Sequence, residues 1–233
     1  MDHIPLQNHL LATLPARTRD RLFPHLTLES VPVGKVLYEP GQALSEVYFP
    51  IDSIVCLLYE MENGASAEIS LVGNEGLVGI AVFMGGESTP SQAIVQNAGH
   101  AYRISAPLFR SEFDNNSEMR MQMLRYTQSV ITQMAQTAFC NRHHTVDQQL
   151  CRWLLLTQDR LSGNRLTMTQ ELMANMLGVR REGVNEAAGK LQKMGVIEYH
   201  RGEIRVLDRP ELEKQCCECY AVAKHETDRL QSC

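Results

Sequence analysis

The chain has 233 residues, a net charge of −5 and seven cysteines, with 44% hydrophobic and 21% charged residues. These values are ordinary for a globular protein of one large or two modest domains. The cysteines are odd in number and scattered, which argues against a disulfide framework and for a reducing cytoplasm. No apolar run reaches the roughly 18 residues of a membrane span, and the N-terminus lacks a secretion-signal pattern. We therefore expect a cytoplasmic protein that makes no membrane contact.

The segment from about Val31 to Ile104 is predicted to be β-structure. Short apolar runs recur there, separated by turn signals such as Pro40-Gly41 and Asn63-Gly64. Asn63-Gly64 predicts a hairpin, because both residues tolerate positive φ. The near-regular spacing indicates a small antiparallel roll or barrel. The expected strands are Val36–Tyr38, Val47–Phe49, Ile54–Tyr59, Ile69–Val72, Ala93–Gln96 and Ala101–Ile104.

Two helices are expected next. In the first, over Ser117–Asn141, apolar residues recur every seven positions, with Met134 between them. Such a seam suits packing along a partner helix, although an intrachain amphipathic helix has the same pattern. The seam residues are Leu124, Ile131 and Ala138. A second helix is predicted over Val146–Leu161 and ends at Ser162-Gly163-Asn164.

The segment Thr169–Leu207 predicts two short helices around a tight turn, followed by a hairpin. Thr169 is a capping residue, and Gly178 falls where the chain must turn sharply. Gly195 is a natural end for the second helix, and strands Val196–Tyr199 and Ile204–Leu207 follow. Residues 142–209 carry a net charge of +3, whereas residues 1–141 carry −6 and residues 210–233 carry −2. Local positive charge of this kind attracts phosphates.

The second of these helices begins with Arg180, Arg181 and Glu182. Arginine bonds guanine bidentately and glutamate accepts from cytosine N4, so this triplet can contact base edges in the major groove. In isolation, the same charges would indicate only a solvated helix start. The helix–turn–helix–hairpin context favours DNA binding, with Arg201 in the hairpin turn placed to contact phosphate.

Three stretches make the chain resemble the Crp/Fnr family of transcription factors: Val33–Leu58, Leu124–Ala138 and Thr169–Ile197. The resemblance implies an α+β fold with three parts. Residues 1–115 would form an antiparallel β-roll sensor of the double-stranded jelly-roll type, similar to a cyclic-nucleotide-binding domain. Residues 116–141 would form a long dimerisation helix, and residues 142–233 a winged helix-turn-helix domain with a helical tail.

By motif position, Arg181 and Glu182 match the family's base-reading pair, and Gln170 matches a position that touches phosphate. Family members often have arginine where this chain has Glu186, so its operator preference need not be the familiar one. Glu186 either accepts from cytosine or pairs with Lys190 one turn on, and we favour the ion pair. The predicted DNA-contact residues are Thr169, Gln170, Arg180, Arg181, Glu182, Asn185, Glu186 and Arg201.

In the family's cyclic-nucleotide members, a Gly-Glu pair binds ribose and an Arg-Ser or Arg-Thr pair binds the cyclic phosphate. Here Gly79 matches the glycine, but Ile80 replaces the glutamate and Pro90-Ser91-Gln92 replaces the arginine. Glu75 offers an alternative Gly-Glu-like feature without restoring the arginine. Because the cyclic phosphate would have no cationic partner, we predict little or no cAMP binding. The candidate effector residues are Gly79, Ile80, Ser91 and Gln92.

No cofactor, metal site or catalytic residue is predicted. An iron–sulfur cluster would need grouped N-terminal cysteines, and Cys56 stands alone; the scattered histidines do not indicate haem. Cys216, Cys217 and Cys219 form a CCEC motif on an expected helix that begins after Asp208. Such a motif can bind a soft metal or oxidise, with His225 the one nearby histidine. We favour buried structural cysteines.

The sequence thus predicts a homodimeric, sequence-specific transcriptional regulator that binds double-stranded DNA at a pseudo-palindromic operator. RNA polymerase would be a further partner if it activates transcription, and an unidentified small-molecule effector is possible. The alternative is a ligand-sensing or protein-interaction module whose winged helix docks a protein. No nucleophile elbow, Walker loop or HExxH motif occurs, which argues against an enzyme.

Overall fold

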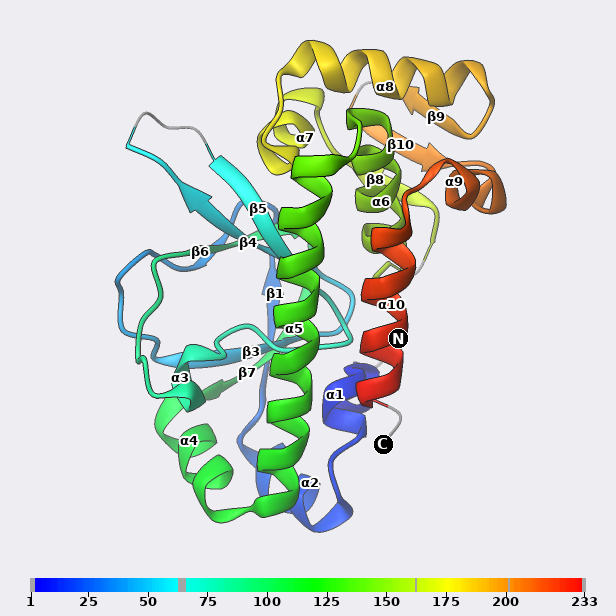
Figure 1. Cartoon of the computed structure of the whole chain (residues 1–233). Coiled ribbons are helices and arrows are strands. Elements are labelled where there is room, and N and C mark those ends of the chain that lie inside the picture. The colour runs from blue at the N-terminus through cyan, green and yellow to red at the C-terminus, as the bar shows by residue number, and fades with distance from the viewer. Residues whose placement is uncertain (1–2, 63–65, 162, 201, 232–233) are drawn as a thin grey trace.

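The N-terminal half is an antiparallel β-roll. In the computed structural model, which describes residues 3–62, 66–161, 163–200 and 202–231, seven strands form two sheets (Figure 1). One sheet has the order β1-β7-β3 and the other β2-β6-β4-β5, with every pairing antiparallel. The strands are β1 (Thr27–Val31), β2 (Val36–Tyr38), β3 (Glu46–Pro50), β4 (Ile54–Glu60), β5 (Ser66–Val72), β6 (Gln92–Asn97) and β7 (Gly99–Ser105).

All six expected strands of the roll are confirmed to within a few residues at their ends. Strand β1 was not predicted, because Thr27–Val31 mixes polar and apolar residues and only Val31 is buried. The expected Asn63-Gly64 turn lies outside the described residues, although β4 and β5 pair antiparallel on either side of it. The fold class is therefore confirmed.

Short helices pack beside the β1-β7-β3 sheet, and their buried apolar residues form one cluster with β3 and β7. Before β1 lie α1 (His9–Ala12) and α2 (Ala16–Leu22), with single 3-10 turns at Pro5–Gln7 and Phe23–His25. Helix α3 (Ala81–Met84) lies between β5 and β6, and α4 (Ala106–Asn115) follows β7. Phe49, Phe83 and Phe109 pack together where these helices meet the roll. These short helices were not predicted; α1, α2 and α3 have too few turns to display an apolar period, whereas Ala106, Phe109 and Phe113 of α4 do have helical spacing.

The long helix α5 (Ser117–His143) crosses the whole molecule (Figure 1). It begins at Asn116, whose side chain accepts from the backbone N–H groups of Glu118 and Met119, both at 3.1 Å. One face is buried against the roll through Met119, Met123, Tyr126 and Val130. The predicted seam of Leu124, Ile131 and Ala138 lies on the exposed side, where Leu124 is 48% and Ile131 57% exposed.

The C-terminal half contains the predicted helix-turn-helix with a three-stranded sheet. Helix α6 (Val146–Gln158) is followed by β8 (Arg165–Thr167), α7 (Gln170–Leu177), α8 (Arg181–Lys193), β9 (Ile197–His200) and β10 (Glu203–Val206). The sheet has the order β8-β10-β9, so β8 adds a strand to the expected hairpin. Helix α6 ends three residues earlier than predicted.

The C-terminal tail forms two helices rather than one. Asp208 caps α9 (Arg209–Gln215) by accepting from the Glu211 N–H at 2.9 Å, as its motif predicts. The chain then turns, and α10 (Glu218–Gln231) runs alongside α5 (Figure 1). The expectation that the CCEC motif lies on one helix is therefore wrong, because Cys216 and Cys217 occupy the junction between α9 and α10.

The two halves of the chain share one hydrophobic core. Roll residues Cys56, Leu58 and Leu71 pack in the same buried cluster as Trp153 of α6 and Met173 of α7. Helix α7 lies against β5, and a Cβ at Gly178 would be in van der Waals contact with Ala67. The helix-turn-helix is thus packed directly on the roll of its own chain. No helix in the described part of the chain has the length and apolar character needed to cross a membrane.

Candidate DNA-binding site

Local sequence signals fix the turn between α7 and α8. The Thr169 hydroxyl accepts from the Leu172 N–H at 3.2 Å and so caps α7. Gly178 ends α7 with φ +65°, a left-handed conformation that favours glycine. Helix α8 then packs through Val184, Ala187, Ala188 and Leu191, all of which are buried. This packing fixes which side of α8 remains in solvent.

The predicted contact residues of α8 share that solvent side. Arg180 stands at the N-terminal cap, and Arg181, Glu182, Asn185 and Glu186 are all exposed. The helix N-terminus carries partial positive charge, which adds to that of the two guanidinium groups. A phosphate backbone beside this end would meet both favourable charge and backbone N–H donors.

The flanking predicted residues complete this surface in part. Thr169 is exposed and Gln170 half-buried, both at the start of α7. Glu186 forms an ion pair with Lys190, at 3.1 Å between Oε1 and Nζ, which agrees with the favoured interpretation. Lys190 also pairs with Asp147 of α6, at 3.0 Å. Arg201 lies outside the described residues.

The predicted effector residues are engaged within the roll. Gly79 has φ +115°, and a Cβ there would lie 3.4 Å from the Glu46 carbonyl oxygen. Ile80 is partly buried in the apolar cluster beside α3 and α4. Ser91 is buried and bonds with Thr89, at 3.0 Å between hydroxyls, and Gln92 donates to Glu39 at 2.7 Å. The polar side chains of Ser91 and Gln92 thus each have a hydrogen-bond partner within the roll.

Side chains fill the interior of the roll beside these residues. Tyr38 and Tyr48 are buried there with Val78, Ala93 and other apolar residues. A cavity next to the two tyrosines measures about 20 Å³. That is room for a single water molecule. Arg103, a cation at the rim of the roll, pairs with Glu46 and with Glu29, the latter at 3.1 Å.

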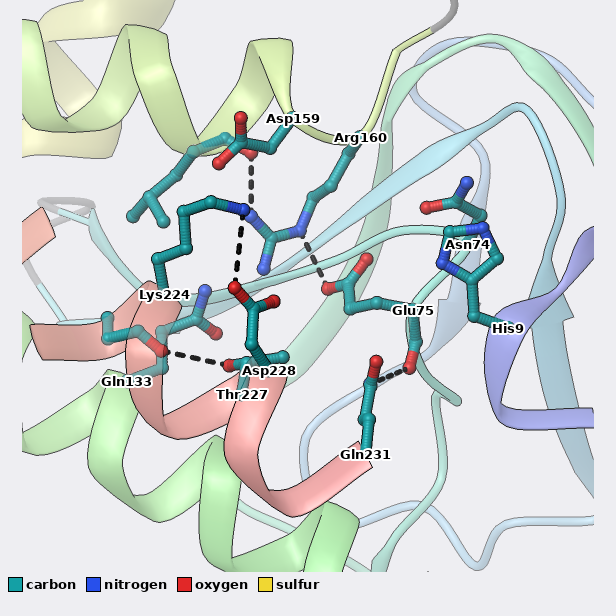
Figure 2. Close-up of a pocket in the computed structure, with 12 residues that line it drawn as sticks. His9, Asn74, Glu75, Gln133, Asp159, Arg160, Lys224, Thr227, Asp228 and Gln231 are labelled. Carbon is teal, nitrogen blue, oxygen red and sulfur yellow. Dashed lines mark hydrogen bonds and ion pairs between the residues drawn. The ribbon is translucent and has the colours of Figure 1, made fainter. Parts of the chain in front are cut away.

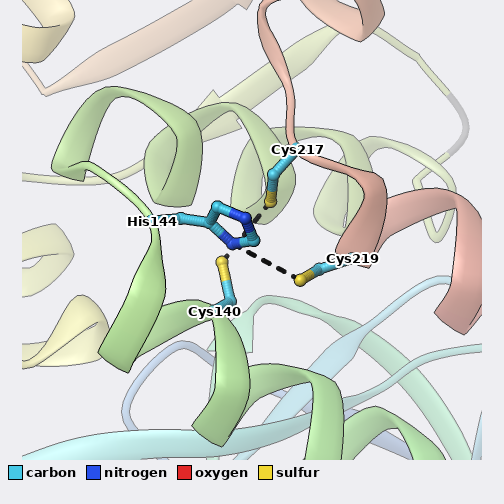
Figure 3. Close-up of side chains that lie close together, drawn as sticks. All are labelled: Cys140, His144, Cys217 and Cys219. Atoms are coloured by element: carbon cyan, nitrogen blue, oxygen red, sulfur yellow. Dashed lines mark hydrogen bonds between the residues drawn. The ribbon is translucent and has the colours of Figure 1, made fainter.

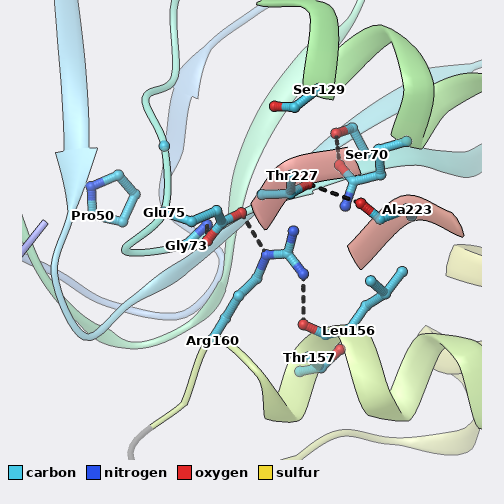
Figure 4. A network of polar contacts seen from close by, with 12 residues as sticks. Pro50, Ser70, Gly73, Glu75, Ser129, Leu156, Thr157, Arg160, Ala223 and Thr227 are labelled. Atoms are coloured by element: carbon cyan, nitrogen blue, oxygen red, sulfur yellow. Dashed lines mark hydrogen bonds and ion pairs between the residues drawn. The ribbon is translucent and has the colours of Figure 1, made fainter. Parts of the chain in front are cut away.

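A larger cavity lies where the roll meets the C-terminal half. Its volume is about 170 Å³, and its walls come from α1, the Gly73–Gly76 loop, α5, the end of α6, and α10 (Figure 2). Arg160 follows α6 and donates to Glu75 at 2.7 Å and to the Leu156 carbonyl at 2.6 Å (Figure 4). Gln231 of α10 donates to the Glu75 carbonyl, also at 2.7 Å. Glu75 therefore serves this junction in the structure, rather than standing free as a ribose ligand.

One buried carboxyl group lies between the two halves. Glu68 of β5 accepts from the Trp153 indole N–H of α6 at 3.4 Å. Burial raises the pKa of Glu68 to about 8, against smaller lowering effects of Trp153, Arg152 and Arg160. At neutral pH this side chain is mainly a neutral acid.

Sequence reasoning did not find the junction residues Arg160, Glu75 and Glu68 as a group. Arg160 and Glu75 are 85 positions apart, as are Glu68 and Trp153. Local periodicity carries no information about contacts between residues so far apart. The one available sign of a special position was a charged residue within an otherwise apolar run, as at Glu68 in the β5 segment.

Comparison with known proteins supports the same architecture. Residues 28–116 match the family model of the cyclic nucleotide-binding domain, and residues 148–215 match that of the Crp-like helix-turn-helix domain. No curated protein matches the chain. A β-roll of this type joined to a winged helix-turn-helix defines a transcriptional regulator with a DNA-binding domain.

Solved structures of transcriptional regulators share this fold. FixK2 from Bradyrhizobium japonicum is 14% identical with a TM-score of 0.71, over 82% of this chain and 98% of that chain. A CRP-family transcriptional regulator from Thermus thermophilus is 15% identical with a TM-score of 0.67, over 80% and 95%. The c-di-GMP responsive regulator CLP from Xanthomonas campestris is 16% identical with a TM-score of 0.65, over 83% and 100%. The chain belongs to the Crp/Fnr family of transcriptional regulators. Because this family consists of regulators, the expectation of a non-enzymatic protein is confirmed.

Proposed function

We propose that the protein is a cytoplasmic homodimer that binds a pseudo-palindromic operator through α8 and does not respond to cAMP. The exposed row at the start of α8 carries the proposal. Arg181 and Glu182 supply base contacts, while Thr169, Gln170 and Arg180 supply phosphate contacts. Because Glu186 is paired with Lys190, we assign it no base contact. Docking of a protein instead of DNA is disfavoured by the Crp-like helix-turn-helix match.

The exposed seam of α5 supports dimerisation. Leu124 and Ile131 present large apolar side chains on one face of a 27-residue helix, and Ala138 continues that face. Exposed apolar residues at sevenfold spacing suit a second copy of the same helix. A two-fold axis along α5 would present two copies of α8 to half-sites about one helical turn, ~34 Å, apart.

The packed interior of the roll supports the absence of a cAMP response. Ile80 and Gln92 offer no charge to a cyclic phosphate, and Gln92 already bonds Glu39. A nucleotide would have to displace buried Tyr38 and Tyr48 and would gain no cationic partner. The 170 Å³ junction cavity, whose wall carries Arg160 and Lys224 together with Glu75, Asp159 and Asp228, offers a small polar effector more room than the interior of the roll.

Selection of bound sequences from a random DNA pool, followed by gel-shift titration, tests the proposal. Arg181→Ala should weaken binding to the selected operator about tenfold to 100-fold, while weak, salt-sensitive binding to unrelated DNA persists. Arg17→Ala, which removes an exposed arginine from α2, is the matched charge control and should bind as the wild type does. Unchanged operator affinity in Arg181→Ala would contradict the assignment. Calorimetric titration with cAMP should show no heat of binding, and micromolar affinity would overturn that part.

A further inference from the structure

Four side chains with metal-binding atoms meet where α5 joins the C-terminal tail. Cys140 lies in the last turns of α5 and His144 at its C-terminal cap. Cys217 lies between α9 and α10, and Cys219 lies in the first turn of α10. Their sulfur and nitrogen atoms all lie within 4.8 Å of one another. In Figure 3 the three sulfur atoms gather around the imidazole ring. We call these residues the Cys₃His cluster.

We propose that the Cys₃His cluster binds one structural Zn²⁺ ion, which fastens the C-terminal tail to the end of α5. All four residues fall outside the two ranges that match family models, residues 28–116 and residues 148–215.

The distances in the cluster fit a single tetrahedral ion. The sulfur atoms of Cys140 and Cys217 are 3.6 Å apart, and the Cys219 sulfur is 3.5 Å from His144 Nδ1. Tetrahedral zinc with Zn–S near 2.3 Å and Zn–N near 2.05 Å has edges of about 3.8 Å between sulfurs and about 3.6 Å between sulfur and nitrogen. These two distances are within about 0.2 Å of the tetrahedral values, and the remaining pairs of ligand atoms lie within 4.8 Å of one another. Four protein ligands leave no open position, which is the pattern of a structural site.

Groups around the cluster orient its ligands. His144 presents Nδ1 to Cys219 and Nε2 to the Glu218 carboxylate, at 3.4 Å. A carboxylate on the second ring nitrogen is the usual partner of a zinc-bound histidine, because it fixes the tautomer that leaves the first nitrogen free to coordinate. The Cys219 backbone N–H also bonds the Cys217 sulfur. Cys140 and Cys219 are fully buried, and Cys217 is 6% exposed.

A buried cation matches the charge of the proposed site. Zinc with three thiolates and a neutral histidine carries −1, and binding releases one proton from each thiol to solvent. Arg152 of α6 is 3% exposed and lies near enough to Cys140 to stabilise its thiolate. Its Nη1 donates to Thr137 at 3.1 Å, but its Nε has no hydrogen-bond partner among the described residues. Burying a guanidinium group with an unpaired N–H costs free energy in a purely apolar core. A neighbouring anionic site would offset that cost.

The location gives the ion a mechanical role. His144 immediately precedes Thr145, whose hydroxyl caps α6, so the cluster holds the joint between α5 and the DNA-binding domain. Without the ion, α10 is held near this joint by its packing on α5, by the Cys219–His144 bond and by the His144–Glu218 pair. With it, the joint and the tail move as one unit.

Metal analysis of protein purified without chelator tests the proposal. We expect about one zinc per chain, and Co²⁺ exchanged into the protein should give the intense visible bands of tetrahedral thiolate coordination. Cys219→Ser and His144→Ala should lose most of the metal. Cys216→Ser, which removes the neighbouring thiol that is not in the cluster, is the matched control and should keep it.

Several outcomes would overturn the proposal. They are wild-type protein free of metal and of cobalt bands, iron in place of zinc, a Cys140–Cys217 disulfide found by thiol counting, or metal loss confined to Cys216→Ser. If a cluster variant does not fold, the wild-type metal content and cobalt spectrum still decide. Hydrogen exchange provides a second measurement, since chelation should release protection in α10 and around His144 but not in the roll strands.

Discussion

Replacing Glu68 with glutamine should change how the stability of the protein depends on pH. In the folded chain the pKa of Glu68 is raised from 4.5 to about 8, because the carboxyl is buried between β5 and α6. The folded state therefore keeps a proton that the unfolded state releases. Between pH 4.5 and 8 the unfolded state binds fewer protons, so stability falls as pH rises and levels off above pH 8.

The magnitude follows from the size of the shift. Each pH unit within that window costs about 1.4 kcal/mol, so from pH 5.5 to 7.5 the wild type should lose about 3 kcal/mol that Glu68→Gln keeps. The amide oxygen of glutamine can still accept from Trp153, so the variant should fold. The variant should therefore gain on the wild type as pH rises towards 8, and the difference between them should stay constant above pH 8.

Urea denaturation at several pH values, followed by Trp153 fluorescence, measures the effect. This is the single tryptophan of the chain, and it touches the group that titrates. Glu60→Gln, an exposed carboxyl at the end of β4, is the control and should track the wild type. If the wild-type and Glu68→Gln curves run parallel across pH 5.5–7.5, Glu68 does not hold a proton in the folded state and the reasoning fails.

Three further predictions concern other parts of the molecule. Arg160→Ala should cost about 3 kcal/mol of stability in urea denaturation, since it leaves the 16% exposed Glu75 carboxylate unpaired. Arg110→Ala, which breaks a more exposed ion pair, should show little change in the same experiment. The double variant Leu124→Glu, Ile131→Glu should be a monomer in sedimentation experiments. Met84→Glu, at an exposed site on α3, should leave the oligomeric state unchanged. A double variant that stays dimeric would show that α5 does not form the interface. Glu186→Ala should leave the selected operator sequence unchanged while Glu182→Ala alters it, and the reverse pattern would restore Glu186 to base contact.

Features encoded over a few residues could be predicted from the sequence. Asp208, Thr169 and Gly178 each act within one turn of their own position, so their capping roles are found where expected. The roll strands follow from apolar runs between turns. The exposure of the Leu124–Ala138 seam could not be decided in advance, because an intrachain helix and a dimer helix share one periodicity.

Features assembled across the chain could not be predicted in the same way. The CCEC motif suggested no metal partner except His225, which lies two turns along α10 from Cys219 and outside the cluster. Its actual neighbours, Cys140 and His144, are more than 70 positions away and arrive only because α10 packs along α5. Cys140 and His144 are four residues apart and therefore on one face of a helical turn, which was the one local clue.

Three sets of contacts hold α6 in place. Glu68 bonds Trp153 on one side of α6, Arg160 bonds Glu75 at its far end, and the Cys₃His cluster lies at its start. Helix α6 is therefore held at both ends and in the middle, and it packs against α8 through the shared core. Each of these contacts answers to a different chemistry: proton loss at Glu68, a ligand competing with Glu75 for Arg160, or thiol oxidation at the cluster. An effector that entered the junction cavity would lie beside the Arg160–Glu75 pair and, if charged, would compete with one of its two members.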